Sequence, residues 1–178
     1  LIAPDELTRQ ALKNTPLASL ANEEDWSLWH SDVGSFDQRH SWNASTLSPQ
    51  LAAPHSPAMG VPLAEHAQTR IDVAYIGACT GAKLEDMRFA AQVLRGKKVA
   101  AGVSLMVAPA SLQDRAQAEA EGTLQILIDA GARLLPSTCG ACAGYGDSFA
   151  ENQTVISSTA RNFKGRMGPA STQVFLGS

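Results

Sequence analysis

The sequence predicts an α/β fold with three layers, α/β/α, built on a mostly parallel sheet and preceded by an irregular N-terminal arm. Residues 71–178 alternate short apolar runs with segments of helical periodicity, the pattern of strands joined by crossover helices. Residues 1–70 differ in composition: they hold six of the nine prolines, all three tryptophans and all four histidines, but two of the fourteen glycines. We therefore place a boundary near residues 68–71, between an arm and an α/β domain.

The arm is expected to begin with one short helix. Pro4, Asp5 and Glu6 are typical of a helix start, because proline and acidic side chains suit the first turn. The helix should end near Lys13. Prolines 16, 49, 54, 57 and 62 then interrupt any long element, so the rest is predicted to be extended and to lie on another surface. We interpret the three tryptophans as packing residues.

In the α/β domain, residues 72–77 form an apolar run with the length of a buried strand. Apolar residues then recur at helical spacing from Leu84 to Leu94, which predicts a helix. Glu85 and Asp86 stand at its start, where acidic side chains complement the helix dipole.

The remaining elements continue this alternation. Residues 103–108 are expected to form a strand, and residues 111–130 a helical segment that Gly122 can break. Three further short strands are expected at 133–135, 154–157 and 173–176. Right-handed crossovers between such strands produce a parallel sheet.

Composition excludes several classes of function. The chain has 14 Lys and Arg against 17 Asp and Glu, a net charge of −3, which does not suit binding to nucleic acid or to an anionic membrane. No apolar run approaches the roughly 18–20 residues of a transmembrane helix, and no signal-peptide pattern opens the sequence. Three cysteines, an odd number, argue against a secreted disulfide framework and favour a reducing, cytoplasmic location.

Cysteines and arginines follow three of the predicted strands. Cys79 comes after the first strand, Cys139 and Cys142 after the strand ending at residue 135, and Arg161 and Arg166 after the strand ending near residue 157. In an open parallel sheet, ligands sit beyond the carboxyl ends of the strands, and these ends share one edge. We therefore expect these five residues to share that edge, where the lone cysteine can meet the C-x-x-C pair.

The chemistry of three thiolates leaves several interpretations open. On zinc, three cysteines form a catalytic site or a structural site that lacks a ligand. On a [4Fe-4S] cluster, they leave one iron free to act as a Lewis acid. A single C-x-x-C can also be a pair of inert thiols. Cys79, taken alone, is more typical of a small apolar side chain buried in the core.

Arg161 and Arg166 add a second element to this edge. They stand five residues apart in a loop-like stretch that contains a glycine. A guanidinium group binds carboxylates with two parallel hydrogen bonds, so arginines beside an open metal position favour a carboxylic-acid substrate. The alternative is simple solvent exposure, which is the usual state of two arginines in a loop.

Three motifs closely resemble the aconitase and isopropylmalate dehydratase superfamily, large-subunit type. They are Tyr-Ile-Gly-Ala-Cys-Thr-Gly-Ala-Lys-Leu-Glu-Asp at 75–86, Pro-Ser-Thr-Cys-Gly-Ala-Cys-Ala-Gly at 136–144, and Ser-Thr-Ala-Arg-Asn-Phe-Lys-Gly-Arg-Met-Gly at 158–168. Segments of the arm, such as Pro-His-Ser-Pro at 54–57, have counterparts as well. The resemblance thus covers nearly the whole chain, but only an internal portion of a full large subunit.

The resemblance implies an aconitase-type domain with a [4Fe-4S] cluster held by Cys79, Cys139 and Cys142. It implies that the enzyme dehydrates and rehydrates a hydroxy-polycarboxylate such as isopropylmalate, homocitrate, citrate or an alkyl malate, with Arg161 and Arg166 holding its carboxylates. It places no catalytic base in this chain. The base is expected from a small subunit or domain that swivels, and other residues from the remaining large-subunit segment.

The chain departs from the family pattern at three positions. Gly81 and Ala160 stand where the family usually has asparagine, and Lys83 stands where arginine is common. These departures leave the substrate open. They also keep an alternative in view, in which the chain is a non-catalytic iron–sulfur or zinc-binding module for assembly or regulation.

Overall fold

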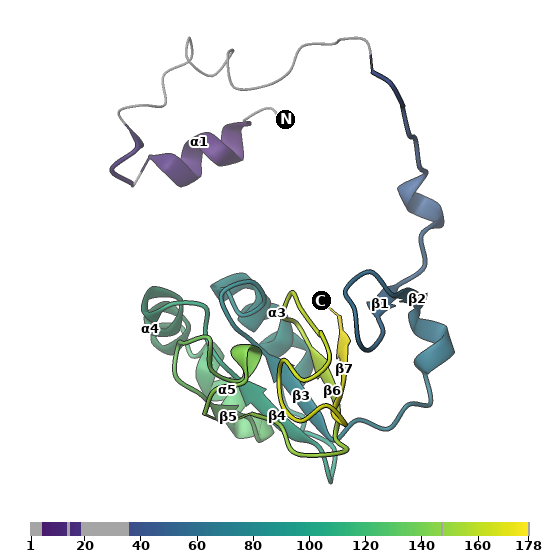
Figure 1. Cartoon of the computed structure of the whole chain (residues 1–178). Helices are drawn as coiled ribbons and strands as arrows, with labels where there is room; N and C mark the ends of the chain where they lie inside the picture. Colours follow the sequence, from purple (N-terminus) through teal and green to yellow (C-terminus); the bar gives the residue numbers. More distant parts are fainter. Residues whose placement is uncertain (1–4, 14, 19–35, 147, 178) are drawn as a thin grey trace. The chain divides into compact units, whose positions relative to one another are not determined.

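A computed structural model describes residues 5–13, 15–18, 36–146 and 148–177. The chain divides into two compact units, Leu1–Thr46 and Leu47–Ser178. Figure 1 shows the second unit as a sheet with helices packed against it.

The described part of the first unit contains the expected helix. Helix α1 spans Glu6–Leu12 and begins with a capping box, in which the Asp5 carboxylate accepts a 2.8 Å hydrogen bond from the Thr8 backbone N–H. Further along, the short 3-10 helix η2 spans Ala44–Thr46. Trp42 is 75% exposed and stacks on His40, with ring centroids 5.3 Å apart. Pro4, Trp26 and Trp29 lie outside the described residues.

The second unit is built on a seven-stranded sheet with the strand order β2-β1-β7-β6-β3-β4-β5. Strands β7, β6, β3, β4 and β5 are parallel, whereas β1 pairs antiparallel with β2 and with β7. The strands are β1 (Gln50–Ala52), β2 (Gly60–Pro62), β3 (Val73–Ile76), β4 (Ser104–Val107), β5 (Arg133–Leu134), β6 (Thr154–Ser157) and β7 (Gln173–Leu176). The α/β class and the mostly parallel sheet predicted from the sequence are confirmed.

The boundary between the two units differs from the one expected near residues 68–71. The sheet unit begins at Leu47, because β1 pairs with β2 and, through Ala52 and Leu176, with β7. The 3-10 helix η3 (Leu63–His66) follows β2, and the His66 ring meets Phe175 edge-on at 4.8 Å. The prolines of this region limit its strands to three residues without preventing them from pairing.

The helices of the second unit form where the sequence predicts them. Helix α3 spans Leu84–Leu94, and the predicted segment 111–130 is two helices, α4 (Leu112–Ala120) and α5 (Thr123–Ala130). Gly122 separates α4 from α5, because its φ of 81° lies in the left-handed region that glycine adopts readily. The three helices contact one another and cover one face of the sheet, where Met87, Leu105, Val107 and Leu127 form a buried cluster.

The opposite face of the sheet carries a second core. Val73, Tyr75 and Val155 point to this face, because successive strand residues alternate between the two faces. The 3-10 helix η4 (Gly140–Ala143) and the loop residues Phe149 and Met167 cover it. The third layer expected on this face therefore consists, in the described residues, of a short 3-10 helix and loops.

Candidate functional site

Three loops that carry the cysteines and arginines meet at one edge of the sheet. Cys79 follows β3, Cys139 and Cys142 follow β5, and Arg161 and Arg166 follow β6, and all three strands belong to the parallel part. Backbone hydrogen bonds extend the ladder to this edge, from the Ser158 N–H to the Tyr75 carbonyl at 3.1 Å and from the Leu135 N–H to the Val107 carbonyl at 2.8 Å. The shared edge expected from the sequence is present.

The loop after β3 is bound tightly to Ser158 at the end of β6. The Ser158 hydroxyl accepts a 3.0 Å hydrogen bond from the Gly77 N–H and donates a 2.7 Å bond to the Gly81 carbonyl. A Cβ atom at position 81 would clash with the Ser158 carbonyl oxygen, at a separation shorter than any real contact. The structure thus accounts for glycine at 81, because a side chain, asparagine included, would push this loop off β6.

The loop after β5 carries the C-x-x-C pair on a tight turn. Cys139 precedes η4 and Cys142 lies within it. Gly144 ends the turn with a φ of 78°, and a Cβ atom there would lie 2.7 Å from the Arg166 carbonyl oxygen. A second link joins the same two loops, where the Phe149 N–H donates to the Met167 carbonyl at 3.1 Å. The cysteine turn and the arginine loop are therefore packed backbone to backbone.

The three cysteines are free thiols with different environments. Cys79 and Cys139 are exposed, whereas Cys142 is half-buried and packs against the core beneath the turn. Within residues 5–13, 15–18, 36–146 and 148–177, no three cysteine, histidine or acidic side chains are grouped closely enough to hold a metal ion. The structure brings the three loops together, and convergence of the three sulfur atoms on one metal site stays a prediction.

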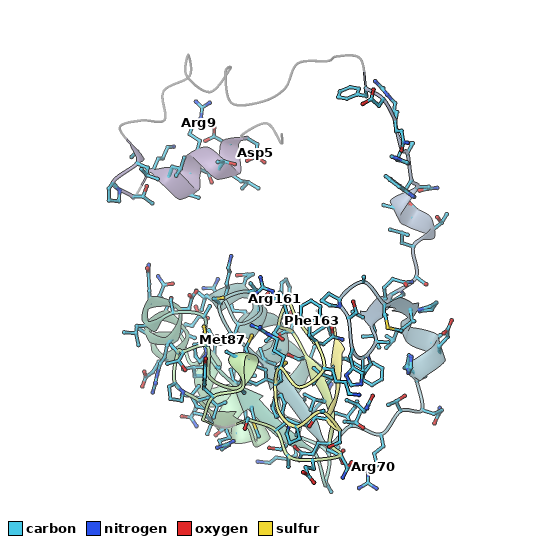
Figure 2. All side chains as sticks on the ribbon, viewed as in Figure 1. Asp5, Arg9, Arg70, Met87, Arg161 and Phe163 are labelled. Carbon is cyan, nitrogen blue, oxygen red and sulfur yellow. The ribbon has the colours of Figure 1, made fainter. Side chains whose placement is uncertain are left out.

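The arginine loop is anchored by Asn162, which the sequence did not single out. Its buried Nδ2 donates 2.9 Å hydrogen bonds to the carbonyls of Ala53 and Val174 and so ties the loop to β1 and β7. Its neighbour Arg161 is exposed, and Figure 2 shows it at the opposite end of the sheet from Arg70. Arg166 is half-buried, and its Nε is buried without a hydrogen-bond partner.

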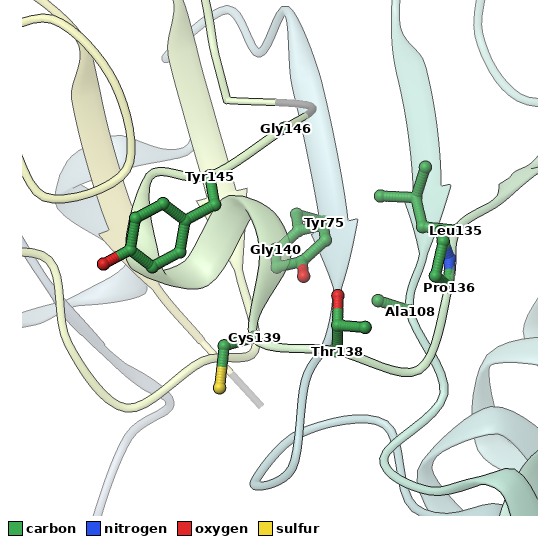
Figure 3. Close-up of a pocket in the computed structure, with 9 residues that line it drawn as sticks. All are labelled: Tyr75, Ala108, Leu135, Pro136, Thr138, Cys139, Gly140, Tyr145 and Gly146. Atoms are coloured by element: carbon green, nitrogen blue, oxygen red, sulfur yellow. The ribbon is translucent and has the colours of Figure 1, made fainter.

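A pocket of about 400 Å³ opens beside Cys139, and Figure 3 shows its lining. Its walls are mostly apolar and include Ala108, Leu135 and Pro136, with the two tyrosines, Tyr75 and Tyr145, also contributing. A pocket of this size suits a small ligand or part of a cofactor.

Tyr75 is the second residue of this edge that the sequence did not single out. It is 1% exposed, and its hydroxyl oxygen is buried without a hydrogen-bond partner. Burial raises the pKa of the Tyr75 hydroxyl to about 12, and the neighbouring Cys142 and Cys139 add to the rise. The backbone amide of Cys142 offsets part of it without reaching hydrogen-bond geometry. The only signal in the sequence was an aromatic residue with a polar tip in a strand otherwise made of apolar residues.

Comparison with known proteins gives consistent matches. A model of the aconitase family (aconitate hydratase) matches residues 64–178. The 3-isopropylmalate dehydratase large subunit of a Nitratiruptor species is 37% identical over 179 residues, which cover 99% of this chain and 42% of that protein. The protein of the same name from Campylobacter concisus is 39% identical over 180 residues, with the same coverage. The chain spans about two fifths of the length of these relatives.

No helix in the described part of the chain is suited to crossing a bilayer. Throughout the part of the chain that the structure describes, none combines the necessary length with the necessary apolar character.

Proposed function

The chain belongs to the aconitase family, and from this we propose that it is the cluster-carrying part of a hydro-lyase that dehydrates and rehydrates a hydroxy-polycarboxylate. The observation that carries this proposal is the meeting of three loops at one sheet edge, with three free thiols and two arginines between them. Among candidate substrates we put isopropylmalate first, a choice that the names of the similar proteins, 3-isopropylmalate dehydratase large subunits, support. Homocitrate, citrate and alkyl malates are the other candidates of the same chemistry.

The residues at this edge suit a [4Fe-4S] cluster in their chemistry. Thiolates are the ligands that iron–sulfur clusters use, and Cys79, Cys139 and Cys142 are unpaired. Three buried polar atoms of β3 and the arginine loop lack partners within the described chain: the Tyr75 hydroxyl, the Arg166 Nε and the Asn162 Oδ1. Buried polar groups normally have hydrogen-bond partners, so this lack supports a group bound at this edge. We propose that the three cysteines hold the cluster.

When bound, the cluster supplies one iron that no cysteine ligates and that acts as a Lewis acid toward a hydroxyl group. The chain's own residues orient the substrate. Arg161 is exposed at the edge, and the partly buried Arg166 is fixed by its backbone contact with Gly144. Guanidinium groups in these positions bind carboxylates and set which carbon atoms face the reacting centre.

The proton transfer needs a group from outside this chain. We propose that the catalytic base comes from a small subunit or a swivelling domain, and that the remaining large-subunit segment completes the site. The chain spans 42% of the relatives' length, so the assembled enzyme contains residues that are not in it. We propose a cytoplasmic location for the enzyme, because reducing conditions there keep three thiols available.

Anaerobic reconstitution with iron and sulfide tests the cluster. The chain should take up about four iron and four sulfide per molecule, develop the broad visible absorbance of an iron–sulfur cluster, and change its EPR spectrum when a substrate hydroxy acid is added with the partner subunit. Cys79→Ser, Cys139→Ser and Cys142→Ser should each reduce iron uptake, whereas Ser137→Ala, on the same loop, should not. Absence of iron uptake by the unaltered chain would overturn the proposal. Binding of zinc alone, with no iron retained, would favour the non-catalytic module.

A further inference from the structure

The Tyr75 hydroxyl lies between the two loops that carry the cysteines. A Cβ atom at Gly77, on the loop that leads to Cys79, would lie 2.6 Å from this oxygen. On the other side, Tyr75 and Cys139 line the same pocket, and Cys142 packs against the core cluster that contains Tyr75. Figure 3 shows the hydroxyl directed into this pocket beside the turn at Gly140.

Packing fixes the position of this hydroxyl. The Tyr75 ring meets the Phe149 ring edge-on, with centroids 5.7 Å apart, and it is enclosed by Val73 and Val155 of the same cluster. Gly77 leaves the space that the ring and the hydroxyl fill. A side chain held on several sides cannot turn its polar tip to solvent, so a partner for the hydroxyl has to come from the groups next to it, the cysteine loops and what they hold.

The pocket itself offers few acceptors. Ala108, Leu135 and Pro136 present apolar side chains, and the hydroxyl of Thr138, which also lines the pocket, makes no hydrogen bond with Tyr75. The groups that flank the hydroxyl are the two cysteine loops. Sulfur atoms, whether cysteine thiolates or inorganic sulfides, accept hydrogen bonds in iron–sulfur proteins and respond to them.

We propose that the Tyr75 hydroxyl donates a hydrogen bond to a sulfur atom of the bound cluster and acts as a positioning residue that tunes it. This inference rests on the proposed function, because it requires the cluster. A hydrogen bond to sulfur stabilises the reduced, more negative cluster and raises its reduction potential. Tyr75, a residue of the buried core, therefore influences the reduction potential of a cluster bound beside it.

The chain contains only two tyrosines, which provides a matched control. Tyr75→Phe removes the buried hydroxyl and keeps the ring, and Tyr145→Phe removes the hydroxyl of a residue that lines the same pocket but is 71% exposed. Both variants and the unaltered chain are loaded anaerobically with iron and sulfide, and the midpoint potential is measured by redox titration followed by EPR. Tyr75→Phe should load iron to the same extent and shift the potential downward. Tyr145→Phe should shift the potential by less, because the hydroxyl of this exposed side chain is hydrated.

Labelling with fluorotyrosine gives a second measurement, which does not depend on whether Tyr75→Phe folds. Producing Tyr145→Phe with 3-fluorotyrosine labels position 75 alone, and the fluorinated hydroxyl is a stronger donor. The midpoint potential of the labelled Tyr145→Phe protein should be higher than that of the same variant with ordinary tyrosine. Packing alone would not cause this response. Equal potentials in all iron-loaded samples, or equal shifts in both Phe variants, would overturn the role of Tyr75 while leaving the cluster in place. Absence of iron in the unaltered chain would overturn the proposed function as well.

Discussion

The Ser158 hydroxyl donates a 2.7 Å hydrogen bond to the Gly81 carbonyl, and the Ser158 backbone occupies the space in which a side chain at 81 would stand. This pair joins the end of β6 to the loop that carries Cys79. The loop that carries Cys139 and Cys142 approaches the arginine loop just as closely, where the Gly144 backbone lies against the Arg166 carbonyl. The candidate site is therefore held by direct backbone approach, which only glycine permits.

Gly81→Ala should destabilise the chain by about 1–3 kcal/mol or more, the usual cost of inserting a methyl group where no space exists. Its Cβ atom would meet the Ser158 backbone, which cannot move without disturbing β6. Gly60→Ala is the control, because a Cβ atom there meets nothing within 4 Å. Denaturant unfolding of both variants measures the difference. Equal stabilities would mean that the loop after β3 is not packed against Ser158.

Asn162→Ala should lower the free energy of unfolding by about 1–3 kcal/mol, because it removes the side-chain donor to the buried Val174 carbonyl and leaves the Ala53 carbonyl with only the longer bond from the Ser56 N–H, at 3.5 Å. The arginine loop should also loosen from β1 and β7, which hydrogen exchange of the amides near residue 163 would detect as faster exchange. Asn152→Gly serves as the control. Asn152 has a φ of 60°, so glycine relieves strain there and should be neutral or stabilising. Unchanged exchange in Asn162→Ala would show that Asn162 does not anchor the loop.

Arg166→Lys should weaken substrate use in the assembled enzyme by roughly 30-fold or more, since breaking a buried charge pair costs about 2–5 kcal/mol. Lysine keeps the charge but loses the paired donors of the guanidinium group. Arg70→Lys is the control, because Arg70 lies at the opposite end of the sheet. The ratio kcat/KM with isopropylmalate and the related hydroxy acids is the measurement. If both variants behave alike, Arg166 does not contact the substrate.

Acid should weaken the contact between Arg88 on α3 and Glu121 at the end of α4. Two hydrogen bonds, 2.9 and 2.6 Å long, join the guanidinium group to this carboxylate and lower its pKa from 4.5 to about 2. A carboxyl group with a depressed pKa in the folded state stabilises the fold above its unfolded pKa, and this contribution disappears as the pH falls from about 4.5 toward 2.

Glu121→Gln should therefore be less stable than the unaltered chain at pH 7, by a small amount because the pair is exposed, and the difference should shrink between pH 4.5 and 3. Glu119→Gln, on the same helix, is the control and should show no such convergence. Thermal unfolding at several pH values supplies the comparison. A difference that is independent of pH would rule out the ion pair as its cause.

Local patterns were sufficient for most elements of residues 71–177. Helix α3, the break at Gly122 and the strands β3, β4, β6 and β7 lie where apolar periodicity and glycine placement predict them. The shared edge of the cysteine and arginine loops could be predicted for the same reason, because parallel strands place their carboxyl ends together. These features depend on residues close together in the sequence and on one general rule of sheet topology.

Other features required the tertiary structure. The two strands within residues 50–62 are short, and the segment is rich in proline. Their place in the sheet therefore depends on the pairing of β1 with β7, which is more than a hundred residues away in the sequence. The unpaired hydroxyl of Tyr75, the anchoring by Asn162 and the exclusion of a side chain at Gly81 are likewise contacts between distant segments. Periodicity reports which side of an element is buried, but it does not report what lies against that side, and this is decided only when the loops pack.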